Sequence, residues 1–445
     1  MAQFFKAIPK NSTKNRIYKN IKIEKLDHQG RGMGHVHGKP IFIEGVLLDE
    51  CVDVQVSEDK KRYLKGSVKR INTMSTLRIS PDCLHYKDCG GCQLQHIDQS
   101  TQIQIKEAGL GHLFKRFAKL SDIILQPFIS GSPWGYRRTA RFGLQYDRKR
   151  KELDMGFRFA QTNKLIKQKV CPVLLPQLEK LIVPLYALLN SLQIKEHLGH
   201  VELLESEQGV VILLRHLKAF SEKDIICITN FAKAHQLNFF IQAQANEFKL
   251  CSGEHKLSYS LPEWHCKFIF AATDFLQVNA EVNKKMVAQA LQWLALEADD
   301  RVLDLFCGLG NFTLPIARQV KTVVGVEGVQ KMVDRATENA RLNHISNSVF
   351  YQADLNNKQI NKQIWAQQKF SKVLLDPARA GALNCMEFIA SLQVSHIVYI
   401  SCDAVTLARD SSVLLENGYK LDKLGLLDMF PQTKHMESMA LFLRC

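Results

Sequence analysis

The sequence predicts an α/β protein whose C-terminal part is a doubly wound parallel sheet and whose N-terminal part is a small β-barrel. Strands and helices alternate from about residue 270 onward, a pattern typical of parallel βαβ units. Short alternating strands separated by glycine turns fill residues 17–71 instead. We therefore divide the chain into a barrel at 12–70, a central α/β region at 71–269 and a doubly wound domain at 270–445. Part of 96–130 is a candidate to pack with the last of these.

The N-terminal strands are expected to form a closed barrel of the OB-like type. Apolar Ile21 and Ile23 alternate with charged residues, and further alternating segments follow at 39–43 and 51–56. Such barrels commonly bind single-stranded nucleic acid on a basic face. The alternative is a structural cap with solvated charges.

Five strands of the C-terminal domain are predicted at 301–305, 322–327, 349–352, 372–375 and 396–400. The segments 421–429 and 439–443 then suggest an antiparallel hairpin at the edge of the sheet, with Glu437 in the loop between its strands.

Composition points to a cytoplasmic globular protein with a polyanionic partner. The 445 residues are 46% hydrophobic and 23% charged, and the net charge is +15. No apolar run reaches the roughly 18 residues of a membrane span, and residues 1–10 lack a signal-peptide core. Residues 137–169 hold eleven Lys or Arg against three acids. A monomer is the default expectation.

A glycine turn at Cys307–Gly310 joins a strand to a helix and would let backbone approach a ligand. Asn311 follows it, and the third glycine of a dinucleotide-binding motif is missing, which disfavours NAD. Glu327 ends the next strand, where it can accept ribose hydroxyls, and Asp354 follows the third strand, near an adenine edge. This pattern favours S-adenosyl-L-methionine, although a plain tight turn remains possible for the glycines alone.

Cys402 follows the predicted strand 396–400, at the carboxyl end of the sheet where ligands bind in open α/β folds. An isolated cysteine is usually an inert buried residue. Here the turn that begins at Asp376 ends the preceding strand on the same rim. We therefore interpret Cys402 as a nucleophile.

Three cysteines, Cys83, Cys89 and Cys92, form a Cys-x5-Cys-x2-Cys motif with two glycines between the last two, and Cys171 follows. Four thiolates of this kind suit a [4Fe–4S] cluster. Zinc is the alternative, disfavoured because no second Cys-x2-Cys pair is present. The spacing also differs from the Cys-x3-Cys-x2-Cys of radical S-adenosylmethionine enzymes, so a structural cluster is expected.

Together these residues resemble the RNA uracil-C5 methyltransferases, most closely the type that carries an N-terminal TRAM barrel and modifies 23S ribosomal RNA. The resemblance covers nearly the whole chain. It implies S-adenosyl-L-methionine as methyl donor, 23S ribosomal RNA as partner, and Cys83, Cys89, Cys92 and Cys171 as ligands of a [4Fe–4S] cluster. It assigns the nucleophile to Cys402 and the general base to Glu437. The cofactor-binding positions that it implies are Gln277, Phe306, Asn311, Glu327, Asp354 and Asp376, and the RNA-binding ones are Arg137, Arg138 and Arg141.

The implied reaction needs both catalytic groups. C5 of uracil is a weak nucleophile, so a thiolate must first add to C6, and a base must later remove the C5 proton. The family usually reads Ser-Cys-Asn-Pro where this chain has Ser401–Ala404. Loss of the proline would loosen the loop, and an ionised Asp403 would raise the thiol pKa unless its side chain points away. The rivals are a transfer-RNA uracil-C5 methyltransferase and a non-catalytic RNA-binding assembly factor.

Overall fold

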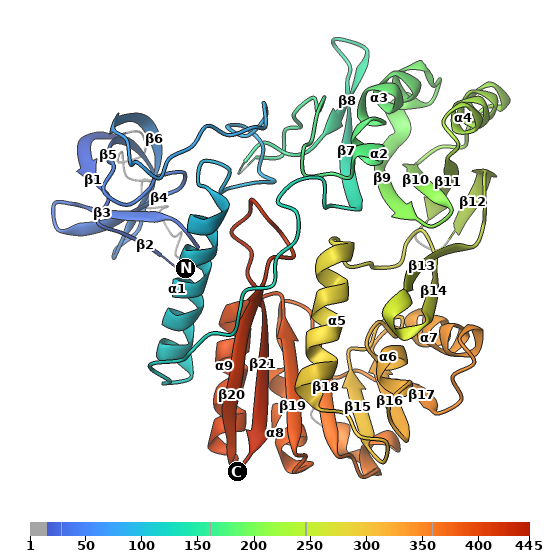
Figure 1. Cartoon of the computed structure of the whole chain (residues 1–445). Coiled ribbons are helices and arrows are strands. Elements are labelled where there is room, and N and C mark those ends of the chain that lie inside the picture. Colours follow the sequence, from blue (N-terminus) through green and yellow to red (C-terminus); the bar gives the residue numbers. More distant parts are fainter. Residues whose placement is uncertain (1–15, 28, 161, 245–246, 358) are drawn as a thin grey trace, which may run out of the picture. The chain divides into compact units, whose positions relative to one another are not determined.

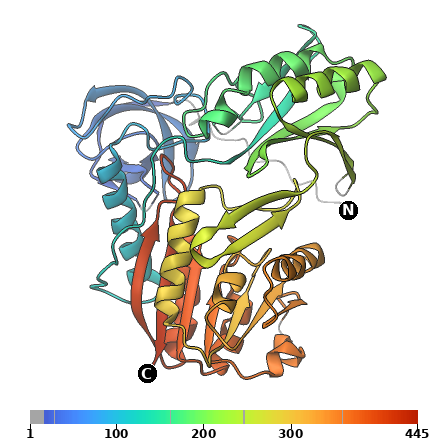
Figure 2. The ribbon, with the colours of Figure 1, turned by 45° about the vertical axis from the view of Figure 1, so that its right-hand side comes forward.

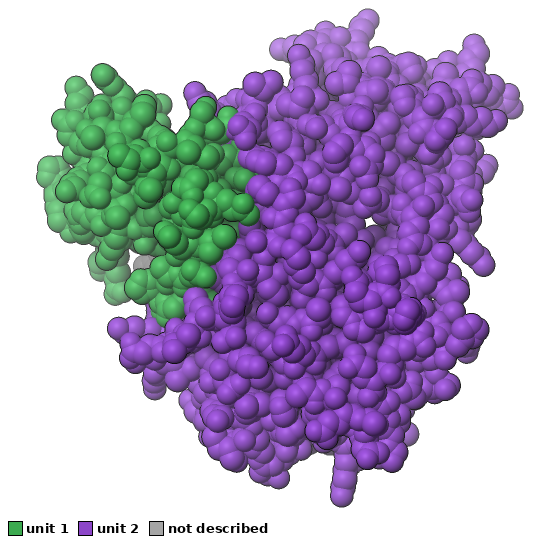
Figure 3. All heavy atoms as spheres, in the orientation of Figure 1, with its two compact units in different colours: residues 1–81, 92–112, 432–434 green, residues 82–91, 113–431, 435–445 purple. Residues whose placement is uncertain are grey.

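The computed structural model describes residues 16–27, 29–160, 162–244, 247–357 and 359–445 (Figure 1). Residues 12–15 of the predicted barrel lie outside this range. The chain forms two compact units, coloured separately in Figure 3. Unit 1 contains residues 1–81, 92–112 and 432–434, and unit 2 contains 82–91, 113–431 and 435–445. Among the described residues, no helix has the length and apolarity required to cross a bilayer.

Unit 1 is built on a six-stranded sheet with the order β1-β5-β6-β4-β3-β2. Its strands are β1 (Ile17–Lys22), β2 (Lys25–Leu26), β3 (Gly32–Val36), β4 (Lys39–Ile43), β5 (Cys51–Asp59) and β6 (Leu64–Thr73). The edge strands β1 and β2 are joined by Ile23 and Glu24 alone, so the sheet closes on itself. Ile23 donates its N–H to the Glu50 carbonyl and Glu24 donates to that of Met33, both at 2.9 Å. The predicted N-terminal domain made of strands is confirmed.

Alternation within β5 builds the core of this barrel. Val52, Val54 and Val56 are buried, while the residues between them are partly exposed. Gly66 of β6 crosses this core closely, because a Cβ there would lie 2.2 Å from Cγ1 of Val54. Helix α1 (Gln99–Phe117) begins in unit 1 and ends in unit 2.

The central region of unit 2 is a mixed sheet with the order β12-β11-β10-β9-β7-β8. Its strands are β7 (Thr139–Asp147), β8 (Glu152–Gly156), β9 (Leu198–Ser206), β10 (Gly209–His216), β11 (Asn238–Gln244) and β12 (Glu247–Ser252). Its helices are α2 (Pro176–Glu179), α3 (Ile182–Ser191) and α4 (Glu222–Ala234), and the hairpin of β13 (Leu257–Leu261) and β14 (Cys266–Phe270) follows. α3 packs on β8 and α4 on β11 and β12, which gives this region its α/β character.

The C-terminal part of unit 2 is a seven-stranded sheet with the order β17-β16-β15-β18-β19-β21-β20. Its parallel strands are β15 (Arg301–Leu305), β16 (Thr322–Glu327), β17 (Ser348–Gln352), β18 (Lys372–Leu375) and β19 (His396–Ser401). Antiparallel β20 (Tyr419–Leu427) and β21 (Glu437–Arg444) complete it. The helices are α5 (Ala280–Leu294), α6 (Thr313–Ala317), α7 (Gln330–Leu342), α8 (Leu383–Ser391) and α9 (Ala404–Glu416). α5 and α9 cover opposite faces of the sheet (Figures 1 and 2). This confirms the predicted Rossmann-like fold.

One expectation for this sheet is wrong. Glu437 was expected in the loop of the hairpin, but it is the first residue of β21 and pairs with Leu427. β21 also lies between β19 and β20, so β20 alone of the two hairpin strands is an edge strand of the sheet. β21 begins this early because Ser438 pairs with Ser401 of β19. The sequence around Glu437 is polar and resembles a loop, and it does not reveal a pairing partner that lies so far away in the chain.

Candidate active site

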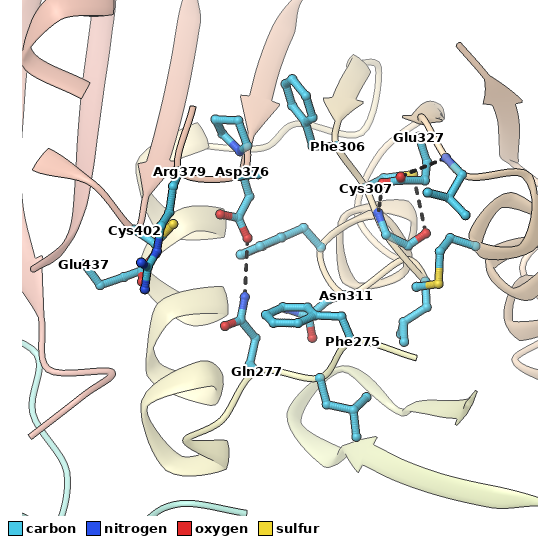
Figure 4. A pocket seen from close by; sticks show the side chains of 18 of the residues that line it. Phe275, Gln277, Phe306, Cys307, Asn311, Glu327, Asp376, Arg379, Cys402 and Glu437 are labelled. Atoms are coloured by element: carbon cyan, nitrogen blue, oxygen red, sulfur yellow. Dashed lines mark hydrogen bonds between the residues drawn. The ribbon is translucent and has the colours of Figure 1, made fainter. Parts of the chain in front are cut away.

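The described residues of unit 2 enclose a cavity of about 560 Å³ at the ends of parallel strands (Figure 4). Residues at or just after the ends of β15, β16, β18 and β19 line it. β18 lies beside β15 although β16 and β17 come between them in the chain, so the strand order reverses there. Ligands of open α/β sheets bind at such a reversal, which makes this cavity the candidate site.

The turn after β15 brings main chain to the cavity wall. Phe306, Gly308 and Gly310 all have positive φ, of 61°, 55° and 95°. The two glycines adopt this conformation at little cost, whereas Phe306 is held in a region that side chains disfavour. Local strain of this kind persists only where neighbouring structure fixes it.

Glu327 ends β16 with its carboxylate against this turn. Its Oε2 accepts the N–H of Gly308 at 3.1 Å, and its Oε1 accepts that of Val329 at 3.0 Å. A carboxylate offers about four acceptor positions, so Glu327 retains capacity for ligand hydroxyls.

The side chain of Asn311 is held by hydrogen bonds to Asn283 and Tyr259. Its amide exchanges hydrogen bonds with that of Asn283 on α5, at 3.0 and 3.2 Å. Its Oδ1 also accepts the hydroxyl of Tyr259 at 3.0 Å. The side chain therefore has a fixed orientation at the edge of the cavity.

Gln277 and Asp376 meet across the cavity. Nε2 of Gln277 donates to Oδ2 of Asp376 at 3.4 Å (Figure 4). Burial raises the pKa of Asp376 from 3.8 to about 7. The structure thus brings Gln277, Phe306, Asn311, Glu327 and Asp376 to one cavity, as their assignment requires.

Cys402 and Glu437 lie with Arg379 on one side of the same cavity, and Glu327 lies on the other (Figure 4). Burial raises the pKa of the Cys402 thiol to about 12, and the carboxylates of Glu437 and Asp376 add to this, while Arg379 opposes it. Burial also raises the pKa of Glu437 well above its usual value, reinforced by Asp376 and opposed by Arg379. Burial and the neighbouring carboxylates therefore favour the protonated forms of both Cys402 and Glu437.

Of the two alternatives that the sequence left open for Asp403, the structure supports the one in which its side chain is directed away from the thiol. Its side chain caps α9, with Oδ1 accepting the N–H groups of Val405 at 2.9 Å and Thr406 at 3.3 Å. The charges that raise the pKa of Cys402 are those of Glu437 and Asp376.

A buried network holds the loop that carries Asp376 and Arg379. Oδ2 of Asp410, on α9, accepts the Tyr399 hydroxyl and the N–H of Ala382, both at 2.7 Å. Nε of Arg409 donates to Oδ1 of Asp410 at 2.7 Å, and its Nη2 donates to the carbonyl of Ala380 at 2.9 Å. The helix α9, which starts just after Cys402, therefore also fixes the loop that carries Asp376 and Arg379.

Asp354 is the exception among the predicted cofactor residues. It is exposed, its Oδ1 accepts the N–H of Asn356 at 2.9 Å, and it is outside the set of described residues that line the cavity. Other lining residues were missed. Arg379 lies three residues after Asp376, and His435 lies two residues before Glu437. Their proximity in the sequence to predicted site residues could have identified them as lining residues. Tyr259 comes from a distant hairpin, and no signal in the sequence marks it.

The three predicted RNA-binding arginines differ in environment. Arg141 is exposed, and its Nη2 lies 2.6 Å from Oε1 of Glu202. Arg137 is half-buried, and its Nε donates to the carbonyl of Thr139 at 2.8 Å. Arg138 is only 4% exposed, and this burial argues against direct contact with RNA.

The basic run at 148–151 is partly neutralised within its own hairpin. Arg150 contacts the carboxylates of Asp147, Glu152 and Asp154 at 2.8, 2.7 and 2.5 Å. Lys167 also contacts Glu152, at 2.6 Å. All three acids of the segment 137–169 are thus paired with these two cations, so the run is less basic than its composition suggests.

Three of the four predicted cluster ligands fall in unit 2, and Cys92 falls in unit 1. Burial raises the pKa of Cys89, and the nearby Cys83 adds to the effect. The N–H of Cys171 donates to Oε1 of Glu179 at 2.8 Å, and the charge of Glu179 also raises the pKa of Cys83. Across the described residues, no group of three potential ligands is arranged to hold a metal ion.

Known proteins resemble this chain over its whole length. The family described as tRNA (Uracil-5-)-methyltransferase matches residues 98–445, and the TRAM domain matches residues 13–69. The 23S rRNA (uracil(1939)-C(5))-methyltransferase RlmD of Psychromonas ingrahamii is 63% identical over 99% of this chain and 100% of its own. The protein of the same name from Vibrio cholerae is 46% identical over all of both chains.

A solved structure shares the fold. The tRNA (uracil-54, C5)-methyltransferase of Pyrococcus abyssi, in complex with S-adenosyl-L-homocysteine, aligns with a TM-score of 0.74 at 21% identity, over 96% of this chain and 99% of its own. The resemblance seen in the sequence is confirmed: the chain belongs to the tRNA (uracil-5-)-methyltransferase family and carries a TRAM domain.

Proposed function

We propose that this protein transfers a methyl group from S-adenosyl-L-methionine to C5 of a uridine in 23S ribosomal RNA, at the position 1939 that its relatives' names carry. The observation that carries the proposal is one cavity lined by a thiol and a carboxyl at one side and by a glycine turn with Glu327 at the other. The length and level of identity with the two relatives favour the ribosomal over the transfer-RNA substrate.

The cofactor would occupy the side of the cavity formed by Gln277, Phe306, Asn311 and Glu327, with Asp376 between it and the reacting base. Glu327 would accept the ribose hydroxyls, in addition to the two N–H groups that it already accepts. When bound, S-adenosyl-L-methionine supplies the methyl as an electrophile on a positively charged sulfur.

Cys402 is the proposed nucleophile. Its thiolate would add to C6 of the uracil, and the displaced electron pair would make C5 an enolate carbon. C5 would then take the methyl group as the methyl–sulfur bond breaks, and that electron pair would stay on the sulfur of the departing S-adenosyl-L-homocysteine. Glu437, as carboxylate, then takes the proton from C5. The electron pair left behind re-forms the C5–C6 double bond and expels the thiolate, so Cys402 and the enzyme are regenerated.

Charge in the cavity would set the timing of these steps. Cys402 and Glu437 have raised pKa values while the site holds no ligand. A cationic sulfonium near them favours both ionised forms, and Arg379 acts in the same direction. The nucleophile would therefore be activated only in the loaded site.

We further propose how the RNA is held. The TRAM barrel at 12–70 and the central region at 71–269 would grip the RNA, Arg137 and Arg141 would contact it, and 270–445 would carry out the methyl transfer. The target base would be flipped into the cavity at a cost of a few kcal/mol. We expect a monomer that acts in the cytoplasm, where its substrate is made.

We also propose that Cys83, Cys89, Cys92 and Cys171 bind a structural [4Fe–4S] cluster. Their spacing in the sequence supports it, as does the proximity of Cys83 to Cys89. Thiolates gain stability from a cationic cluster, which would offset the burial that raises the pKa of Cys83 and Cys89. Anaerobic purification followed by iron and sulfide analysis tests the assignment, because zinc without iron would overturn it.

The function is tested with 5-fluorouridine-substituted 23S fragments and S-adenosyl-L-methionine, resolved on a denaturing gel. Fluorine at C5 cannot leave as a proton, so the thiol–RNA adduct should be trapped and the protein band should shift. Cys402→Ala should abolish the shift. Cys307→Ala, which removes the other thiol of the same cavity, should retain it.

Each alternative has its own result. An adduct with transfer RNA but none with 23S fragments would replace the ribosomal substrate by a transfer RNA. No adduct with either RNA, from protein that binds both, would support an RNA-binding assembly factor. An adduct that survives Cys402→Ala but is lost in Cys307→Ala would move the nucleophile to Cys307.

A further inference from the structure

We propose that Arg138 is a positioning residue for the cofactor side of the cavity, and that it does not contact RNA. The inference rests on the proposed function, because it concerns Gln277 and Asn311 as cofactor-binding residues. It begins from a cation that the protein buries although the sequence places it in its most basic segment.

Arg138 joins the central region of unit 2 to the segment that carries Gln277. It directly precedes β7, and its N–H donates to the carbonyl of Val278 at 2.9 Å. Its side chain makes a second bond, from Nε to the carbonyl of Gln277 at 2.7 Å. The first bond is made by the main chain and survives substitution by Met or Lys, whereas the second depends on the guanidinium. A charge-assisted bond of this length is among the stronger ones in proteins.

The same guanidinium also supports Asn311 through Tyr259. Cζ of Arg138 lies 4.9 Å from the centre of the Tyr259 ring, in cation–π geometry. The Tyr259 ring also stacks on Phe268, at 4.8 Å between centres and 9° between planes. Held in this way, the Tyr259 hydroxyl donates to Oδ1 of Asn311 at 3.0 Å.

Arg138 is therefore in contact with the supports of two proposed cofactor residues, although it is outside the set of described residues that line the cavity. The nearby charge of Glu205 favours the cationic form of Arg138 and so offsets part of the cost of its burial. Lysine cannot replace it fully, because only a planar guanidinium can lie over the Tyr259 ring while its Nε donates to the carbonyl of Gln277.

The test measures S-adenosyl-L-homocysteine affinity by calorimetry on RNA-free protein, and RNA affinity with a 23S fragment in the absence of cofactor. Arg138→Met should raise the Kd for S-adenosyl-L-homocysteine about tenfold, the order expected for loss of one charge-assisted hydrogen bond. Its Kd for RNA should stay within about twofold. Arg138→Lys should fall between wild type and Arg138→Met, and Tyr259→Phe, which keeps the ring but loses the hydroxyl, should also weaken binding.

Arg141→Gln is the matched control, since it removes an exposed arginine three residues away. It should weaken RNA binding and leave S-adenosyl-L-homocysteine binding unchanged, the reverse of the Arg138 pattern. If Arg138→Met does not fold, Arg138→Lys carries the test. A folded Arg138 variant that binds S-adenosyl-L-homocysteine with wild-type affinity overturns the inference. This holds if the variant has lost RNA affinity, and it also holds if the variant has only a lower melting temperature. Wild-type protein that binds no S-adenosyl-L-homocysteine would instead refute the proposed function.

Discussion

The protonated state of Cys402 can be measured directly in the ligand-free protein. Burial and the neighbouring carboxylates raise the pKa of its thiol from 9.0 to about 12. At pH 8 the thiolate fraction should then be about 10⁻⁴, against about 10⁻¹ for a thiol of ordinary pKa, a ratio of roughly 10³. A more basic thiolate is also a better nucleophile, with a Brønsted coefficient of about 0.4–0.5. Over the roughly three pKa units between the two thiols, this makes each Cys402 thiolate about 20-fold more reactive. Cys402 should therefore react about 50-fold more slowly than the same cysteine in an unfolded peptide.

The assay labels the RNA-free and cofactor-free protein with a small neutral methanethiosulfonate and quantifies the Cys402 peptide by mass spectrometry. A synthetic peptide of residues 399–409, in which Cys402 is the single cysteine, gives the reference rate. Cys402 is partly exposed, so access to the reagent should not limit the reaction.

The pH dependence is the sharper part of this test. The labelling rate of Cys402 should rise tenfold per pH unit up to at least pH 10, whereas the rate of the peptide should level off near pH 9. A plateau for Cys402 below pH 9, or a rate at pH 8 above that of the peptide, would refute the argument. The nucleophile would then be activated by the protein alone and would need no ligand charge.

Three further results are expected. Burial raises the pKa of Asp304 from 3.8 to about 7, so between these pH values Asp304 binds a proton in the folded state but not in the unfolded state. The free energy of unfolding should therefore fall as the pH rises through this range. Asp304→Asn should remove this fall, which amounts to at most about 4 kcal/mol between pH 4 and pH 8 in urea unfolding, and an unchanged pH dependence in the variant would contradict the argument. Glu437→Gln should form a covalent adduct with ordinary uridine RNA and lose roughly 10²–10⁴-fold in turnover, because the C5 proton is not removed, and turnover near the wild-type rate would exclude Glu437 as the base. Gly381→Ala should destabilise the protein more than Gly418→Ala; both positions have positive φ, of 77° and 83°, and each should lose about 1 kcal/mol from strain. A Cβ at 381 would also lie 2.6 Å from Oδ2 of Asp410, whereas none of the described atoms lies within 4 Å at 418, so equal losses in chemical denaturation would count against the clash.

The sequence predicts the C-terminal sheet well because its strands are short apolar runs that end in polar turns. β18 and β19 are almost entirely buried, as expected for central parallel strands, and such runs are visible without any tertiary information. The meeting of Cys402 with Asp376 follows from the same rule, since adjacent parallel strands deliver their carboxyl ends to one rim.

Long-range pairing explains the features that the sequence does not reveal. Glu437 belongs to a strand because Leu427 and Ser401 extend the ladder on both sides of β21. In the sequence, Arg138 is one more residue of a basic segment, and its side chain is bound in the fold by the carbonyl of Gln277, 139 residues away. A local sequence pattern shows which side chains are charged, but it does not show which of them are buried in contacts within the protein.

The division of the chain into units has a consequence for biosynthesis. Residues 432–434 belong to unit 1, and Gln432 accepts the N–H groups of Gln93 and Leu94 there, both at 3.0 Å, and the Nε2 of Gln102 at 3.0 Å. The ribosome makes these residues only after every strand from β1 to β20. Domains usually fold in the order of their synthesis, N-terminal first. The barrel can close early, but the remainder of unit 1 must wait for a segment translated after most of unit 2, so the two units should complete their folding together.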